Sequence, residues 1–266
     1  MRKRILIFII LIFLLTSSVP AGIEVRAPGL PENFTPPVYQ PLRSPKSNPF
    51  KVGERLVYSI QWMGIEAGTG ILEVGDRTDY QGIPTYHFVS RARTSPNFSK
   101  FYPVEDRLDS FAAVEGLRSH LYVRHLREGF YKHDSTTTVD HQIGKAYYQD
   151  KTYKTKSGVK DDLCGLYYFR TLKDLEPGKT VVIEVFAYKK TWEIVANILG
   201  RERVVTPAGA FDTLKIEPLI KHRGIFKNLG RVFLWVTDDA RRLPVMVQSK
   251  IIIGEITASL QEYRLE

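Results

Sequence analysis

The sequence is poor in the residues that build metal and catalytic sites. Its 266 residues include one cysteine, Cys164, so neither an internal disulfide nor a cysteine pair for zinc can form. Gly-x-Ser-x-Gly motifs and glycine-rich phosphate loops are absent. His120 and His125 are five residues apart and would point to opposite faces of a strand. We therefore expect no metal and no cofactor, and the sequence favours a protein that is not an enzyme.

Long apolar runs are also scarce, and the clearest one lies at the N-terminus. Residues 5–15 are apolar, follow Arg2, Lys3 and Arg4, and precede small residues that include Val19 and Ala21. This order predicts a secretory signal peptide over residues 1–21. As a helix the run would span ~16 Å, against ~30 Å for the hydrocarbon core of a bilayer, which favours cleavage over an uncleaved anchor. An uncleaved membrane anchor stays open as the alternative.

The absence of a cysteine near the cleavage site excludes a lipobox and the lipid anchor that it would carry. We predict an exported, periplasmic protein that is soluble after cleavage, with peripheral membrane contact at most. The formal charge of +9 falls to about +6 without the signal peptide. That excess would attract anionic lipid or polysaccharide, or simply keep the surface solvated. No motif for nucleic acid is present, so none is expected as a partner.

Prolines are concentrated between the signal peptide and the remainder of the chain. Because proline has no N–H and a fixed φ, residues 22–49 are predicted to form an extended, proline-rich leader that pairs with no sheet. A single β-rich domain is predicted over residues 50–266. The prolines of the leader are Pro28, Pro31, Pro36, Pro37, Pro41, Pro45 and Pro49.

From residue 50 onward the apolar pattern has a period of two. Leu56, Tyr58, Ile60 and Trp62 alternate with more polar residues, and residues 117–124 and 255–260 do the same. Glycine-containing turns recur at hairpin spacing. The predicted fold class is mainly β: a curved antiparallel meander of about 10–12 strands that forms a barrel or half-open barrel.

One amphipathic helix is predicted over residues 161–175, packed on or in the barrel. Asp161 or Asp162 can cap its amides, and Glu176-Pro177-Gly178 would end it. A helical turn is predicted at residues 95–101. Residues 181–186 and 232–236 are apolar at both parities, which indicates strands covered on both faces, one of them by the helix.

Two aspartate pairs are the only candidates for acid–base chemistry. Asp161 and Asp162 are explained by helix capping. Asp238 and Asp239 follow the strand at 232–236 and precede two arginines, which is typical of a tight turn held by local hydrogen bonds and charge pairs. The alternative is a ligand-binding cluster at the barrel rim. That cluster would consist of Trp235, Asp238, Asp239, Arg241 and Arg242.

Several segments together resemble the start, middle and end of the bacterial DUF3108 proteins. They are FKVGERLVY at 50–58, WMGIEAG at 62–68, DDL and YYFR at 161–170, TPAGAFDT at 206–213 and LWVTDDARRLPV at 234–245. The resemblance implies an exported, β-rich envelope protein of unassigned activity, and it supplies no catalytic residues. A looser analogy of architecture is with the half-open barrels of periplasmic lipoprotein carriers, where helices cover an apolar cavity.

These observations favour a non-catalytic binding or envelope-assembly module whose apolar interior can hold a lipid or other amphiphile. Two other hypotheses stay open. One is an envelope glycan hydrolase that uses Asp238 or Asp239. The other is a scaffold that pairs with an envelope protein partner through a strand edge. A monomer is expected.

Overall fold

The computed structural model describes residues 24–39, 48–222, 225–226, 231–250 and 254–266. The predicted signal peptide lies outside them. The elements, in chain order, are β1 (Glu24–Arg26), β2 (Arg55–Trp62), β3 (Ile65–Val74), β4 (Thr78–Tyr80), β5 (Ile83–Thr94), η1 (Phe98–Lys100), β6 (Glu105–Ala113), β7 (Ser119–Glu128), β8 (Tyr131–Asp140), β9 (Lys145–Tyr148), β10 (Lys151–Lys154), α1 (Asp162–Thr171), β11 (Thr180–Ala187), β12 (Lys190–Thr206), β13 (Gly209–His222), β14 (Ile225–Phe226), β15 (Arg231–Thr237), β16 (Pro244–Lys250) and β17 (Glu255–Arg264).

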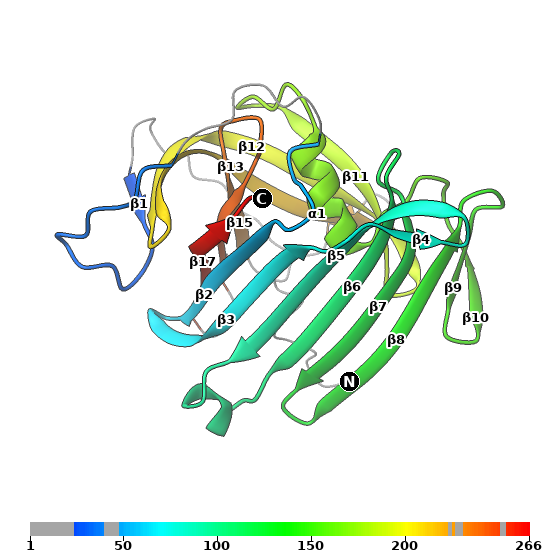
Figure 1. The fold of residues 1–266 in the computed structure, drawn as a ribbon, viewed down its shortest axis with the longest axis horizontal. Helices are drawn as coiled ribbons and strands as arrows, with labels where there is room; N and C mark the ends of the chain where they lie inside the picture. Colours follow the sequence, from blue (N-terminus) through cyan, green and yellow to red (C-terminus); the bar gives the residue numbers. More distant parts are fainter. Residues whose placement is uncertain (1–23, 40–47, 223–224, 227–230, 251–253) are drawn as a thin grey trace.

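The strands form one strongly curved sheet in which antiparallel neighbours follow one another along the chain (Figure 1). β2 pairs with both β3 and β17, which joins the N-terminal and C-terminal parts of the domain. Between β10 and α1, the backbone of Lys160 donates a hydrogen bond to the Glu184 carbonyl and accepts one from the Phe186 amide, both on β11. Over the described residues the sheet does not close, and the half-open barrel of the sequence prediction is confirmed.

The described residues contain seventeen strands, more than the 10–12 predicted. Five of them, β1, β4, β9, β10 and β14, have four residues or fewer. Alternation is not visible over so few residues, so the sequence pattern detected only the longer strands. The fold class is unaffected by the difference.

The leader is not unpaired, which corrects the prediction made from its prolines. β1 pairs in parallel with β12 through Glu24–Arg26, and Val38 forms a bridge with Ala210. The Tyr39 ring packs on Phe211 with 4.8 Å between ring centroids. β1 contains no proline, so its N–H groups remain available for the ladder.

The only α-helix in the described part of the chain, α1, lies against the inner face of the barrel at one end (Figure 1). Asp161 caps it, because its carboxylate accepts a hydrogen bond from the Cys164 amide at 2.8 Å. Gly165 allows close contact with Ile183 and Val185 of β11. The helix ends at Thr171, before the predicted position, because Leu172 is extended, while Leu175 is still buried. The predicted turn at 95–101 contains the 3₁₀ helix η1.

The prediction that two strands are covered on both faces holds for β15 and only in part for β11. In β15, Val236 packs in the core beside α1, and Phe233, which has the opposite parity on the strand, packs in a second core. In β11, Ile183 and Val185 lie beneath the helix, but Val182 on the opposite face is 54 % exposed. The first half of β11 is therefore solvated on one side.

A buried ion pair fixes the helix to the sheet. The Arg170 guanidinium donates to both carboxylate oxygens of Glu54, at 2.6 and 2.8 Å, and both side chains are 1 % exposed. Arg170 Nε also donates to the Arg241 carbonyl at 3.1 Å. One arginine thus connects α1, the residues before β2 and the turn between β15 and β16.

Candidate functional site

The turn between β15 and β16 carries most of the predicted rim residues. Thr237 N donates to the Leu243 carbonyl, and Leu243 N donates to Thr237 Oγ1, both at 2.9 Å. These bonds close a loop over residues 238–242, in which Arg242 has a left-handed φ of 46°. The aspartates therefore project from a tight turn at the end of a buried strand.

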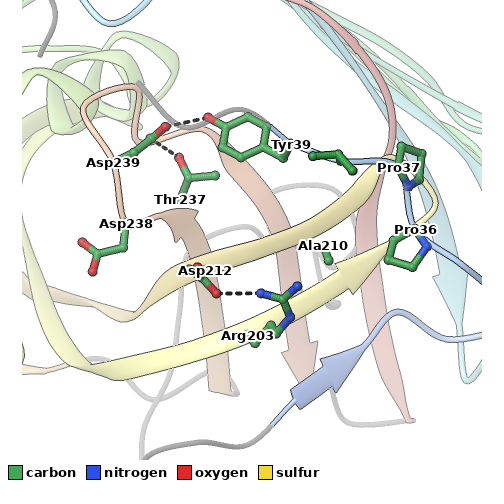
Figure 2. A pocket seen from close by; sticks show the side chains of 10 residues that line it. Pro36, Pro37, Tyr39, Arg203, Ala210, Asp212, Thr237, Asp238 and Asp239 are labelled. Atoms are coloured by element: carbon green, nitrogen blue, oxygen red, sulfur yellow. Dashed lines mark hydrogen bonds and ion pairs between the residues drawn. The ribbon is translucent and has the colours of Figure 1, made fainter. Parts of the chain in front are cut away.

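Asp239 is engaged on several sides, as Figure 2 shows for two of its contacts. Its carboxylate accepts hydrogen bonds from the Tyr39 hydroxyl at 2.7 Å, Thr237 Oγ1 at 2.5 Å and the Arg241 amide at 3.1 Å. Burial, and then the neighbouring carboxylate, raise the pKa of Tyr39 above its ordinary value. Asp239 therefore joins the leader to the turn.

Asp238 lies between two arginines. It accepts from Arg201 Nε at 2.6 Å and from Arg242 Nη1 at 3.1 Å, while Arg201 also reaches Glu176 at 2.7 Å. Asp238, Asp239 and the Arg203–Asp212 pair line a cleft of about 530 Å³ together with residues 36–39 of the leader (Figure 2). The sequence had not identified Tyr39, Arg203 or Asp212, because they lie far from the aspartates along the chain.

The structure does not bring Trp235 into this cluster. Its side chain is buried, and its indole Nε1 donates to Glu202 Oε2 at 2.7 Å. Lys215 donates to the other oxygen of Glu202 at 2.9 Å and lies 5.1 Å from the Trp235 ring centroid. Trp235 thus belongs to a separate buried network, while Asp238, Asp239 and Arg242 meet at the turn and Arg241 contributes its backbone there.

Replacing Asp239 with asparagine is expected to lower the free energy of unfolding by about 1–3 kcal/mol, because a donor replaces an acceptor beside three donors. Chemical denaturation measures this change. The matched control is Asp212→Asn, whose side chain is 83 % exposed and whose salt bridge should contribute about 0–1 kcal/mol. A loss of glycan hydrolysis without any loss of stability would contradict this account and favour the hydrolase.

The inner face of the barrel presents a continuous apolar wall. Direct cross-strand partners share a face, and the register aligns one aliphatic side chain from each of six neighbouring strands. The first of them pack beside α1 and are fully buried, whereas those farther along the sheet are half-buried. The row, from β12 to β2, is Ile198, Ile216, Leu234, Val247, Ala258 and Ile60.

The inner face becomes polar on the strands that follow. The successive cross-strand partners from β3 to β8 are Leu72, Ser90, Leu108, Arg124 and Ser135. The row therefore changes from a leucine on β6 to a buried arginine on the next strand, β7. Leu72 and Leu108 pack on the same core as α1, which identifies this as the inner face.

Arg124 is surrounded by aromatic rings. Its Nε donates to Ser135 Oγ at 3.1 Å, and its guanidinium carbon lies 5.1 to 5.8 Å from the ring centroids of Tyr122, Tyr148 and Tyr188. Asp162, in the first turn of α1, is half-buried, and partial burial raises the pKa of its carboxyl against the opposing effect of Arg124. In the sequence Arg124 belongs to the more polar parity of an alternating strand, opposite Leu121 and Val123, whereas the structure buries it together with His120 and Tyr122.

A second polar feature of this face is the carboxyl pair Asp106 and Glu128. Burial, followed by the charge of Asp106, raises the pKa of Glu128 to about 7. Asp106 is 5 % exposed and accepts a hydrogen bond from the Arg127 amide at 2.7 Å. The two carboxyl groups therefore favour a state in which Glu128 holds a proton.

This pair predicts a pH dependence of stability. The folded pKa of Glu128 lies above the unfolded value of about 4.3, so the folded state binds the proton more tightly. Its contribution to stability is full below the unfolded pKa and is lost as the pH rises through about 7. Glu128→Gln should therefore flatten the decline of the urea midpoint between about pH 4 and 7. Exposed Glu105 offers the control, Glu105→Gln, and equal slopes in the wild type and Glu128→Gln would contradict the assignment.

Other ligand chemistries find little support in the part of the chain that the structure describes. These residues contain no group of three or more His, Cys, Asp or Glu side chains arranged to hold a metal ion. Cys164 is buried, and burial raises the pKa of its thiol well above the ordinary value, so it is a poor nucleophile. None of the described helices has the length and apolar character required to cross a membrane.

Comparisons with known proteins address the fold and the family. A family model described as "Protein of unknown function (DUF3108)" matches residues 57–261. The β-barrel-like DUF1849 protein of Brucella abortus is similar in structure, with a TM-score of 0.53 and 9 % sequence identity over 81 % of this chain and 98 % of that one. At such identity the likeness shows the fold alone.

Two further solved structures match with lower TM-scores. A candidate exported protein with a YmcC-like fold from Bacteroides fragilis gives 0.33 at 13 % identity, covering 81 % of this chain and 97 % of that one. A candidate lipoprotein from Parabacteroides distasonis gives 0.38 at 9 % identity, covering 83 % of this chain and 100 % of that one. No curated protein matches the chain.

Proposed function

The chain belongs to the DUF3108 family, whose function is unassigned, and from that premise we propose that it is a non-catalytic binding module of the cell envelope. In this proposal the inner face of the half-open barrel holds a lipid-like amphiphile. Localisation in the cell envelope is supported by the N-terminal order of cations, apolar residues and small residues, which is typical of a secretory signal peptide.

The observation that carries the proposal is the apolar wall. Leu234, Val247, Ala258 and Ile60 are consecutive cross-strand partners, and all four are only half-buried although they face inward. An aliphatic row that is left partly accessible can gain about 25 cal/mol for each Å² of apolar surface that a ligand covers. An acyl chain lying across these strands would provide such a cover.

The polar residues on the other side of the barrel supply a complementary environment for a headgroup. Arg124, Ser135 and the Asp106–Glu128 pair lie on the inner faces of β6 to β8. Ligand sites in proteins are commonly apolar with a few polar groups that fix orientation. An amphiphile, with one apolar and one polar part, fits this division better than a sugar or a nucleotide does.

The hydrolase hypothesis draws less support from the same geometry. Asp238 is held between Arg201 and Arg242, and Asp239 accepts three hydrogen bonds from the turn and the leader. Neither aspartate lies on the inner face with the apolar wall. The contacts of both are those of groups that hold a turn and a leader in place.

The experiment is extraction of lipid from the purified, exported protein followed by mass spectrometry. We expect a defined class of acyl-chain amphiphile in close to stoichiometric amount, and its removal should lower the melting temperature because a ligand that binds only the folded state stabilises it. Repeated extraction of a ligand-free, equally stable protein from its native envelope would overturn the proposal and leave the fold intact.

A further inference from the structure

Three loops meet at one end of the barrel, the end away from α1. The register places the start of β3 beside the end of β5, and the start of β6 beside the end of β7. The β2–β3 turn, the β5–β6 loop with η1 and the β7–β8 turn therefore form one rim, which Figure 1 shows along a single edge of the sheet.

This rim presents apolar side chains to solvent. Met63 and Ile65 are 62 % and 63 % exposed, Phe101 is 86 % exposed and Phe130 is 108 % exposed. At the opposite end, the turns at 75–77, 81–82, 114–118 and 141–144 and the loop before β2 carry two large exposed apolar side chains among the described residues, Ile143 at 56 % and Val52 at 39 %. Exposed phenylalanines at the ends of two separate loops have no structural explanation within the fold.

The loops are held in place and support one another. The Trp62 and Phe98 rings pack edge to face at 5.9 Å, which joins the β2–β3 turn to η1. Gly129 N donates to the Pro103 carbonyl at 2.7 Å, which joins the β5–β6 loop to the β7–β8 turn. The loops that carry Phe101 and Phe130 are therefore fixed relative to each other, and both rings project into solvent.

Cations flank the exposed rings. Lys100 precedes Phe101, and Lys132 is two residues after Phe130; both lysines are exposed and neither forms an ion pair with any described residue. The whole chain has a formal charge of +9. Apolar rings beside lysines are the combination that binds the interface of an anionic bilayer, where rings enter the acyl boundary and cations meet headgroups.

We propose that this rim, defined by Met63, Ile65, Phe101 and Phe130 with Lys100 and Lys132, docks the protein on an anionic lipid bilayer. The apolar side chains stand on separate loops with charged residues such as Glu66 and Glu105 between them. A protein partner would require one contiguous apolar patch, whereas a deformable bilayer accepts separate insertions. The inference does not depend on lipid binding inside the barrel.

The test places an environment-sensitive fluorophore on a cysteine introduced at the rim. Phe130→Cys carries the probe, Ile143→Cys at the opposite end is the matched control, and native Cys164 is buried and unreactive. Vesicles of phosphatidylethanolamine and phosphatidylglycerol are added to the full chain. We expect a blue shift and quenching by acyl-chain nitroxides at position 130 and neither at position 143, which separates the rim from any contribution of the N-terminal run.

The unlabelled double variant Phe101→Ser/Phe130→Ser completes the test by vesicle flotation. It should bind at least about tenfold more weakly than Ile143→Ser, and vesicles of phosphatidylcholine should bind the wild type less than anionic vesicles do. Equal probe responses at positions 130 and 143, no response at either, or a single protein partner captured through position 130 without any vesicle response would each overturn the proposal.

Discussion

Replacing Arg170 with alanine should destabilise the protein by about 3–5 kcal/mol, the cost of leaving a buried charge without its partner. Glu54 would remain at 1 % exposure with neither of its two hydrogen bonds from the guanidinium. The Arg241 carbonyl would also lose its donor. Because Arg170 connects three distant segments, the loss should appear as a lower urea midpoint for the whole domain.

Two controls separate the charge from the volume. The double variant Glu54→Leu/Arg170→Met removes both charges, and it should recover most of the lost stability because an apolar pair of similar size often replaces a buried ion pair at little cost. Glu266→Gln, which removes the exposed pair with Lys51, should change stability by about 0–1 kcal/mol. A double variant as unstable as Arg170→Ala would show that the hydrogen bond to Arg241, and not the uncompensated charge, dominates.

Replacing Ala92 with tryptophan should weaken amphiphile binding by at least about tenfold, equivalent to about 1.4 kcal/mol. Ala92 lies on the inner face of β5, half-buried, beside Gly70 on β3. Gly70 has no side chain, so an indole at position 92 would fill space next to the apolar wall that the acyl chain is proposed to occupy. Titration with a fluorescent fatty-acid analogue measures the change.

The neighbouring residue provides the matched control. Arg93 is exposed and points to the opposite face of the same strand, so Arg93→Trp adds an indole without entering the interior. Its affinity for the analogue should equal that of the wild type. The proposal fails if both tryptophan variants bind the analogue as the wild type does while keeping wild-type melting temperatures.

The sequence predicts most of the fold because its strands follow local rules. Alternation at Leu56, Tyr58 and Ile60 matches the inward face of β2, and Asp161 caps the helix as its position before an apolar run suggests. The leader was predicted less well, because its proline content restricts only the prolines and their neighbours and says nothing about pairing of the residues between them. Glu24–Arg26 contains no proline and pairs with β12.

The candidate site was predicted in part, because distant pairings leave no local trace. Asp238, Asp239 and Arg242 share a turn, so their proximity follows from spacing alone. Tyr39 reaches Asp239 from 200 residues away, and Glu54 reaches Arg170 across 116. The prediction grouped Trp235 with the turn because it is close to the turn in sequence. In the structure its buried indole donates to Glu202, which also accepts from Lys215.

The most direct test of amphiphile binding is a map of where an acyl chain lies. A lipid with a photoreactive group in its acyl chain is bound to the protein, illuminated, and its crosslinks are located by mass spectrometry. We expect crosslinks on the apolar wall, at Ile60, Leu234, Val247 or Ala258. Crosslinks confined to the outer face of the sheet, or to Phe101 and Phe130 at the rim, would contradict binding inside the barrel.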